Sequence, residues 1–208
     1  VIVSSTGALE LKKIPKKMII VGAGVIGLEM GSIYSRLGTE VTVVEFFDKV
    51  LNGMDHDISK NFKSILQKQG FKFHLNSSVS MITKEKKGVK VTFKQVDSHD
   101  QNELSADVVL VATGRKPFTK NLKLENIGVK LNPKGQVETD NNWRTTATNI
   151  FAIGDVTSGP MLAHKAEEEG IAVAEILAGQ AGHVNYDVIP GVIYTSPEVA
   201  LSLIHISE

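Results

Sequence analysis

The stretch Met18-Ile-Ile-Val-Gly22-Ala-Gly24-Val-Ile-Gly27-Leu-Glu29 decides the fold of the first part of the chain. It places three glycines, spaced Gly-x-Gly-x-x-Gly, between an apolar run that suits a buried parallel strand and the start of an amphipathic helix. Gly22 permits a tight turn, Gly24 lets the backbone approach a phosphate, and Gly27 lets the helix pack closely on the strand. The N–H groups and the positive dipole end of such a helix face an anion. The stretch therefore predicts a dinucleotide pyrophosphate site.

The residues that follow complete a βαβ unit. Apolar side chains recur at helical spacing until Gly38, where we expect the helix to end. They are Ile26, Met30, Ile33, Tyr34 and Leu37. A second strand, Glu40 to Val44, ends at Glu45. Glu45 follows Gly27 at close to the roughly 20-residue spacing of the acid that binds ribose hydroxyls. The alternative is a purely structural glycine turn with a surface glutamate.

The residue type at Glu45 also predicts which cofactor binds. A carboxylate accepts hydrogen bonds from a free ribose 2′-OH and repels a 2′-phosphate. The following residues hold no arginine pair for a phosphate, and the nearby cation is Lys49. These features favour NAD over NADP.

Composition sets the class of protein. The chain has 208 residues, 42% of them hydrophobic and 22% charged, with a formal net charge of zero. This profile suits one large or two small cores, and we expect neither a nucleic-acid partner nor a membrane partner. No apolar run approaches the roughly 20 residues that span a bilayer. The chain has no cysteine, which excludes disulfides, thiolate metal sites and dithiol chemistry within it.

The segments after the βαβ unit predict the rest of an α/β domain with a parallel sheet and a β-meander. Asp55-His56-Asp57 caps a second helix in preference to binding a metal. The expected elements are that helix up to Gly70, a strand at Phe71 to His74, a paired Val79 to Thr83 and Val89 to Lys94, a polar loop at Asp97 to Glu103, and a buried strand from Asp107 to Gly114.

A second candidate site follows near the end of the chain. The apolar run Ile150 to Ile153 predicts a strand, and it ends in Gly154-Asp155. After Pro160 we expect a helix from about Met161 to Gly179. Asp155 could accept hydrogen bonds from sugar or ribitol hydroxyls, and the helix start could support negative charge. A turn followed by a cap is the alternative interpretation.

Together with the turn Thr113-Gly114-Arg115-x-Pro117, these motifs resemble those of the flavin-dependent disulfide reductases. Longer stretches, covering roughly residues 1–200, are similar to the dihydrolipoamide dehydrogenase family, especially its mitochondrial form. These stretches are Ser5-Thr-Gly-Ala-Leu9, Ile14-Pro-Lys-Lys-Met18, Gly22 to Glu29, Ile58-Ser-Lys-Asn-Phe62, Gln67-Lys-Gln-Gly-Phe-Lys-Phe73, Gly114-Arg-Lys-Pro-Phe-Thr-Lys-Asn-Leu122, Gly154-Asp155, Gly159 to Glu168 and Val192-Ile-Tyr-Thr195.

The resemblance implies two sets of cofactor-binding residues. Those for NAD are Gly22, Ala23, Gly24, Val25, Ile26, Gly27, Leu28, Glu29, Glu45 at the adenosine ribose, Val79 and Gly114. Those for FAD are Asp155 at the ribitol and Met161, Leu162, Ala163 and His164 beside the flavin. His164 is assigned a position rather than a catalytic role, and no residue of this chain is assigned to catalysis or to a metal.

The resemblance also implies a reaction and partners. In the family, electrons pass from dihydrolipoyl groups to a disulfide, to FAD and then to NAD, with a histidine–glutamate pair from the partner subunit of a homodimer as acid and base. The substrates are lipoylated acyltransferases of 2-oxo acid dehydrogenase complexes, or the H-protein. A eukaryotic member of the family would lie in the mitochondrial matrix, and a member that is not eukaryotic would lie in the cytoplasm. This chain carries the NAD half, because it has no cysteine and His205 and Glu208 do not reproduce the catalytic pair.

The expected division has three parts. Residues 1–117 form a Rossmann-like NAD-binding domain, 118–186 a central FAD-contacting domain, and 187–208 the truncated start of an interface domain with an atypical tail from residue 201. We expect the strands of 185–200 to lack sheet partners. Two alternatives remain: an inert NAD-binding module, or a related reductase of the glutathione or mercuric type, which Glu45 disfavours.

Overall fold

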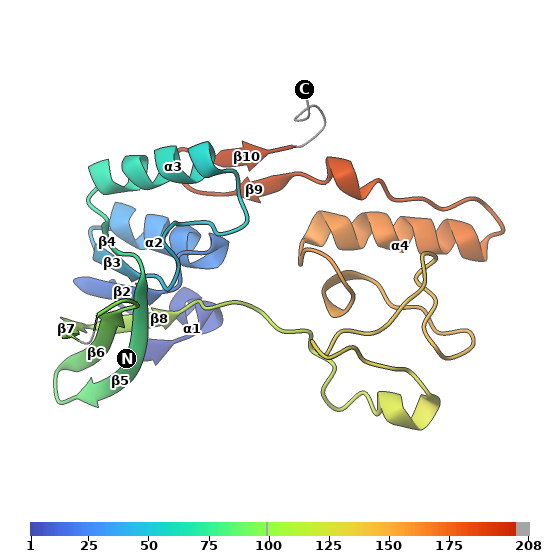
Figure 1. Cartoon of the computed structure of the whole chain (residues 1–208), viewed down its shortest axis with the longest axis horizontal. Coiled ribbons are helices and arrows are strands. Elements are labelled where there is room, and N and C mark those ends of the chain that lie inside the picture. The colour runs from blue at the N-terminus through green and yellow to red at the C-terminus, as the bar shows by residue number, and fades with distance from the viewer. Residues whose placement is uncertain (99, 203–208) are drawn as a thin grey trace. The chain divides into compact units, whose positions relative to one another are not determined.

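The computed structural model describes residues 1–98 and 100–202. These residues form two compact units (Figure 1). Unit 1 consists of Val1–Gly114 with Val192–Ala200, and unit 2 consists of Arg115–Gly191 with Leu201 and Ser202. None of the helices in the described ranges is both long and apolar enough to cross a membrane.

Unit 1 is built on a five-stranded parallel sheet with the strand order β1-β8-β2-β3-β4. The predicted strands at Met18 to Val21, Glu40 to Val44 and after Asp107 are confirmed. The strands are β1 (Ile2–Val3), β2 (Lys17–Val21), β3 (Glu40–Val44), β4 (Lys72–His74) and β8 (Val108–Val111).

Both faces of this sheet are covered, which is why the central strands β2 and β8 are almost entirely apolar. Side chains alternate along a strand, so Met18 and Ile20 of β2 pack into one core while Ile19 and Val21 pack into another. The first core holds helix side chains, including Leu28. The second core holds residues of an antiparallel sheet (Figure 1).

That antiparallel sheet is the predicted meander, with strands β5 (Ser77–Glu85), β6 (Gly88–Gln95) and β7 (Gln101–Ala106). The inward positions Val89, Val91 and Phe93 of β6 are buried, as the alternation predicts. The prediction of a loop through Glu103 is wrong, because β7 begins at Gln101 and pairs with β6. Its first side chains are exposed at the edge of the sheet, so their polarity was no sign of a loop.

Three helices belong to unit 1: α1 (Ser5–Leu9), α2 (Val25–Arg36) and α3 (His56–Lys68). Asp55 caps α3 by accepting from the N–H groups of Asp57 and Ile58, so this triplet is a cap as predicted. In α2 the expected apolar face is partly wrong, because Ile33 and Leu37 are exposed. Glycines take their place against the sheet: a Cβ at Gly31 would lie 2.8 Å from Ile20 Cδ1.

Unit 2 contains one long helix, α4 (Ala163–Leu177), among loops and short turns (Figure 1). Its small core is formed by Trp143, Ala172 and Val184. The prediction of a strand at Ile150 to Ile153 is wrong. Phe151 forms only an isolated bridge with Arg144, and no strand of the described residues pairs with the rest of the segment. The short turns are η1 (Leu124–Ile127), η2 (Gly154–Val156) and η3 (Tyr186–Val188).

Strands β9 (Gly191–Ile193) and β10 (Val199–Leu201) pair with each other, so the expectation of unpartnered strands is wrong. Ile193 is fully buried in the core of unit 1. An apolar anchor of this kind holds the segment on the unit. His205 and Glu208, with most of the atypical tail, lie outside the described residues.

Candidate functional site

The glycine turn and Glu45 come together at the carboxyl edge of the parallel sheet. In the register, Val21 lies opposite both Val44 and Val111, so Gly22, Glu45 and Ala112 follow three neighbouring strands at the same edge. Open α/β sheets bind ligands outside the carboxyl ends of their strands, where the order of connections reverses. The strand order β8-β2-β3 creates this reversal beside β2.

Two of the three glycines are required by the protein itself. Gly22 has a φ of +104°, and a Cβ there would lie 2.5 Å from the carbonyl oxygen of Ala112. At Gly27 a Cβ would collide with the carbonyl oxygen of Gly22 and lie 3.0 Å from Ile20 Cγ2. A larger residue at Gly22 would collide with the Ala112 peptide, and one at Gly27 would push α2 away from β2.

Gly24 is different, because no contact within the described chain requires a glycine there. Its φ of −79° and ψ of 179° are open to any residue, and a Cβ would meet nothing within 4 Å. The space in front of Gly24 suits the close approach of a phosphate to the backbone.

The start of α2 offers the matching donors. Its first intrahelical bond runs from the N–H of Leu28 to the Gly24 carbonyl, so the preceding N–H groups of the helix have no intrahelical acceptor. No side chain of the described residues caps α2, whereas Ser4 caps α1 and Asp55 caps α3. The free N–H groups at the start of α2 therefore suit an anion.

Glu45 is held rigidly beside this turn. Its side chain is nearly buried, with Oε2 accepting from Ala23 N at 2.5 Å and Oε1 accepting from Phe47 N at 2.9 Å. A carboxylate has about four acceptor positions, so lone pairs remain for ribose hydroxyls. The two backbone bonds fix where these acceptors point.

Four further predicted residues of unit 1 lie on β5, on α2 and beyond the end of β8. Val79 is half-buried in β5, whose first residue is hydrogen-bonded to the Glu45 carbonyl. Gly114 has a φ of +126° beyond the end of β8. Glu29 accepts from Tyr194 N at 2.8 Å. Leu28 is fully buried, so its side chain serves packing.

Asp155 lies in η2 of unit 2 and pairs with an arginine that sequence reasoning did not assign. Arg115 Nη2 donates to Asp155 Oδ2 at 2.6 Å, and the Asp155 side chain is 36% exposed. One face of the carboxylate is therefore held by a guanidinium while the rest stays open to a further donor. The two residues are 40 positions apart, so no local pattern predicts the pair.

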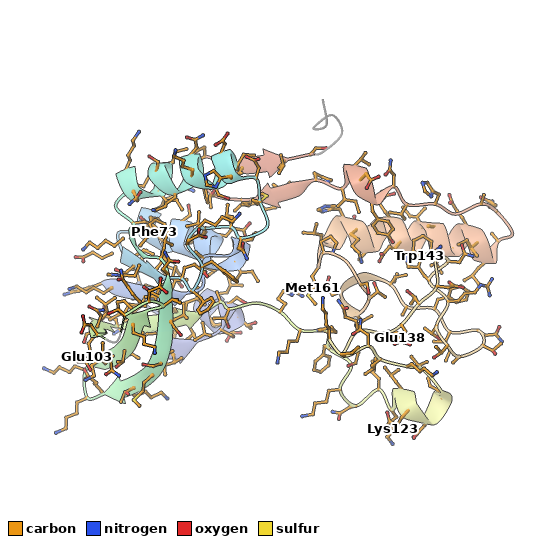
Figure 2. All side chains as sticks on the ribbon, in the orientation of Figure 1. Phe73, Glu103, Lys123, Glu138, Trp143 and Met161 are labelled. Carbon is orange, nitrogen blue, oxygen red and sulfur yellow. The ribbon has the colours of Figure 1, made fainter. Side chains whose placement is uncertain are left out.

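The start of α4 resembles the start of α2. Leu162 is the N-cap residue without a side-chain hydrogen bond, and the first intrahelical bond is from Ala166 N to the Leu162 carbonyl. Met161 therefore precedes the helix, on the loop seen in Figure 2. His164 Nε2 donates to the carbonyl of Pro190 at 2.9 Å, which supports a positional role for this residue.

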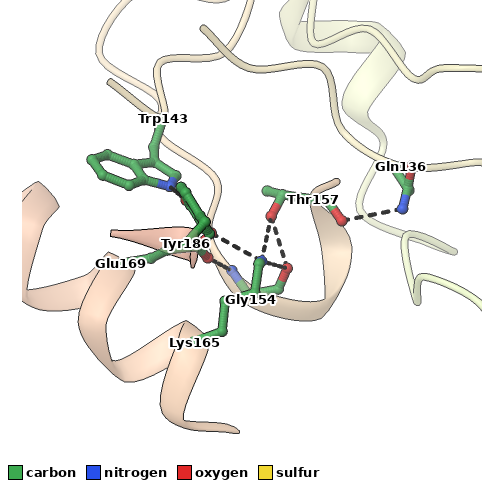
Figure 3. A network of polar contacts seen from close by, with 7 residues as sticks. All are labelled: Gln136, Trp143, Gly154, Thr157, Lys165, Glu169 and Tyr186. Atoms are coloured by element: carbon green, nitrogen blue, oxygen red, sulfur yellow. Dashed lines mark hydrogen bonds and ion pairs between the residues drawn. The ribbon is translucent and has the colours of Figure 1, made fainter. Parts of the chain in front are cut away.

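A buried polar network lies behind the Asp155 turn (Figure 3). Lys165 and Glu169 are one turn apart on α4, both nearly inaccessible, with Nζ and Oε1 2.9 Å apart. Tyr186 donates to Glu169 Oε1 at 2.7 Å and accepts from Trp143 Nε1 at 3.1 Å. The sequence shows the i, i+4 spacing of the ion pair but not that it is buried.

The network changes the acidity of two groups. Burial raises the pKa of Glu169, but hydrogen bonds from Gly154 N–H, Lys165 and Tyr186 outweigh it and leave the pKa below its usual value. Burial, followed by the hydrogen bond to Glu169, raises the pKa of Tyr186 to about 12. The carboxylate is thus kept charged and the phenol is kept neutral.

Unit 2 also contains a hollow of about 760 Å³, which the predicted FAD residues do not line. Its walls include Trp143, His183 and the loop Thr157 to Pro160. Within residues 1–98 and 100–202 there is no cluster of three or more acidic, histidine or cysteine side chains that could hold a metal.

The family profile and the similar sequences indicate the same protein family. The sequence profile of the family described as "Pyridine nucleotide-disulphide oxidoreductase" matches residues 1–170. The chain is 54% identical over 201 residues to the mitochondrial dihydrolipoyl dehydrogenase of Homo sapiens, and 52% identical over 199 residues to that of Pisum sativum. These matches cover 96% of this chain but only 40% of the length of each relative.

Solved structures agree with the sequence matches. The HOCl-induced flavoprotein disulfide reductase RclA from Escherichia coli aligns with a TM-score of 0.86 at 33% identity, covering 96% of this chain and 45% of its own. LpdA from Mycobacterium tuberculosis aligns with a TM-score of 0.82 at 31% identity, covering 92% of this chain and 41% of its own. The predicted fold class is therefore confirmed.

Proposed function

Because this chain belongs to the pyridine nucleotide-disulphide oxidoreductase family, we propose that it is the NAD-binding and flavin-contacting segment of a dihydrolipoyl dehydrogenase. Unit 1 would bind NAD through the turn Gly22 to Glu29, with Glu45, Val79 and Gly114. Unit 2 would contribute Asp155 and Met161 to His164 to an FAD site.

The observation that carries the NAD assignment is the contrast among the three glycines. Gly22 and Gly27 are explained by contacts within the chain, but Gly24 leaves open space in front of the backbone, and the close approach of a phosphate would use that space. The uncapped start of α2 supplies N–H donors for a pyrophosphate, and Glu45 supplies acceptors for ribose hydroxyls. A buried, rigid carboxylate also disfavours a 2′-phosphate, which supports NAD over NADP.

The chemistry of unit 2 fits an FAD segment, though less completely. Asp155 keeps free acceptor positions beside Arg115, and the uncapped N–H groups of α4 suit a negatively charged ring edge. FAD, when bound, would supply the electron transfer between a dithiol and NAD. The chain's own residues would bind and orient the two cofactors.

The activity of a whole enzyme extends the proposal beyond this chain, which spans 40% of the length of the curated relatives. We propose oxidation of dihydrolipoyl groups carried by a 2-oxo acid dehydrogenase complex or the H-protein, by a homodimer. The mitochondrial names of the relatives support a mitochondrial location. Residues 1–117, 118–186 and 187–208 would be the NAD-binding, central and interface segments.

The alternative, an inert NAD-binding module, differs in what the isolated chain does. We would purify the chain, titrate it with NADH, measure bound flavin by its absorbance, and assay NADH-dependent diaphorase and lipoamide turnover. The proposal expects NADH binding, bound flavin and no lipoamide turnover, because the chain has no cysteine. An inert NAD-binding module would bind NADH without flavin. Absence of NADH binding would contradict it, and lipoamide turnover would contradict the assignment of the dithiol chemistry to residues outside this segment.

A further inference from the structure

The peptide groups on both sides of Gly154 are clamped by two charged side chains of α4 (Figure 3). The N–H of Gly154 donates to Glu169 Oε2 at 2.6 Å. Its carbonyl accepts from Thr157 Oγ1 at 2.8 Å and from Lys165 Nζ at 3.4 Å. Asp155, the next residue, is therefore held through the backbone that precedes it.

The turn leaves little freedom around this clamp. Gly154 has a φ of +73°, and a Cβ there would lie 3.1 Å from Ala166 Cβ. A Cβ at Gly159 would lie 3.0 Å from Lys165 Cε. The loop from residue 154 to residue 159 is thus fitted around the Lys165 side chain at both of its ends.

Stability alone is a weak reason for such a pair. Lys165 and Glu169 are 0% and 1% exposed, so both charges have lost their water. The desolvation of a buried ion pair can exceed its Coulomb gain, and apolar replacements of similar volume are often neutral or stabilising. This pair also holds a tight turn, so it determines the geometry of that turn as well.

We propose that Lys165 and Glu169 are positioning residues of the flavin site: they fix the Gly154 peptide and so aim the Asp155 carboxylate at the ribityl hydroxyls of FAD. This inference rests on the flavin role proposed above for Asp155. Arg115 holds the Asp155 carboxylate at Oδ2, while Glu169 and Lys165 hold the preceding backbone at Gly154.

Hydrogen exchange on the full 208-residue chain without flavin tests the positioning. The Thr157 N–H donates to the Gly154 carbonyl, while Lys165 Nζ contacts this residue through its Oγ1 at 3.4 Å, so the amide reports the hydrogen bond that closes the turn. In the double variant Lys165→Met/Glu169→Leu, we expect the hydrogen-exchange rate of the Thr157 amide to increase by a factor at least about tenfold larger than that of the α4 amides. Tyr186→Phe, which removes another bond of Glu169, should affect Thr157 and α4 equally, and exposed Glu168→Gln should change neither.

If the pair has only a structural role, the Thr157 amide and the α4 amides should lose protection from hydrogen exchange in the same proportion, both in Lys165→Met/Glu169→Leu and in Tyr186→Phe. That result would overturn the proposal. If the double variant does not fold, Glu169→Gln, which keeps the side-chain volume, carries the same expectation. FAD fluorescence quenching by the same proteins tests the ligand: the Kd should rise at least about tenfold when the charged contacts are lost. A wild-type chain that binds no FAD, with Thr157 still released in the variant, would refute the flavin role and leave the positioning supported.

Discussion

The carboxylate of Glu45 accepts a hydrogen bond from the backbone N–H of Ala23, in the middle of the glycine turn. The two candidate contacts for one dinucleotide, a phosphate turn and a ribose acid, are thereby joined into one rigid group. The bond uses one oxygen of the carboxylate, and Phe47 N uses the other, so the orientation of the acid is set before any ligand binds.

Replacing this acid should weaken NAD binding. We expect Glu45→Ala to cost about 1–3 kcal/mol of NAD binding free energy, the scale of a lost charged hydrogen bond. Titration calorimetry measures the change. Glu40→Ala is the matched control, since Glu40 starts the same strand and its side chain is 64% exposed. Unchanged NAD affinity in Glu45→Ala would refute the ribose assignment.

Gly27→Ala should lower the stability of the fold. The new methyl group would meet the Gly22 carbonyl oxygen, so we expect a loss of about 1–3 kcal/mol in the free energy of unfolding. Urea unfolding followed by circular dichroism provides the measurement. A variant as stable as the native chain would mean that helix α2 does not pack on β2 as closely as described.

The segment after unit 2 should contribute to the stability of unit 1. Ile193→Ala removes a fully buried side chain from the core of unit 1, and we expect a cost of about 2–5 kcal/mol. Tyr194→Ala, next to it and 69% exposed, should cost little. Equal unfolding free energies for the two variants would place Ile193 outside the core.

The buried network predicts a specific pH dependence for unit 2. The pKa of Glu169 is lowered in the folded state, so its contribution to stability is present above the usual value of 4.5 and is lost as the pH falls through the folded pKa. The pKa of Tyr186 is raised from 10.0 to about 12, so its contribution is present below pH 10 and is lost as the pH rises through about 12.

Thermal unfolding measured across the pH range tests both the acid limb and the alkaline limb, which are the losses of stability expected at low and at high pH. Glu169→Gln should flatten the acid limb and Tyr186→Phe the alkaline limb, because each removes the titrating group. Exposed Glu168→Gln and Tyr194→Phe serve as controls. If the loss of stability at low pH persists in Glu169→Gln, or the loss at high pH persists in Tyr186→Phe, the pH dependence belongs to other groups.

The sequence predicted unit 1 well because its signals are local. The glycine spacing, the alternation in β6 and the cap at Asp55 each specify structure within a few residues. It failed at Ile33 and Leu37, which are exposed although Met30 and Tyr34 are buried as expected. A hydrophobicity pattern cannot show that a glycine such as Gly31 takes a place on the buried side of the helix.

Unit 2 was predicted less well because long-range contacts decide its structure. Ile150 to Ile153 has the composition of a strand but makes only the single bridge between Phe151 and Arg144 in the described chain. The bond between Arg115 and Asp155, and that between Tyr186 and Glu169, join residues that are distant in sequence. The uncapped start of α4 carries no sequence signal beyond the lack of a capping residue.

Gly24→Ala separates NAD binding at the glycine turn of unit 1 from the stability of the fold. The added methyl group meets no atom of the chain within 4 Å, so thermal unfolding should be unchanged. It would occupy the space needed by the pyrophosphate, so calorimetric titration should show a Kd for NAD at least about tenfold higher than that of the native chain, or about 1.4 kcal/mol of lost binding free energy. Native stability with undiminished NAD affinity would contradict the account.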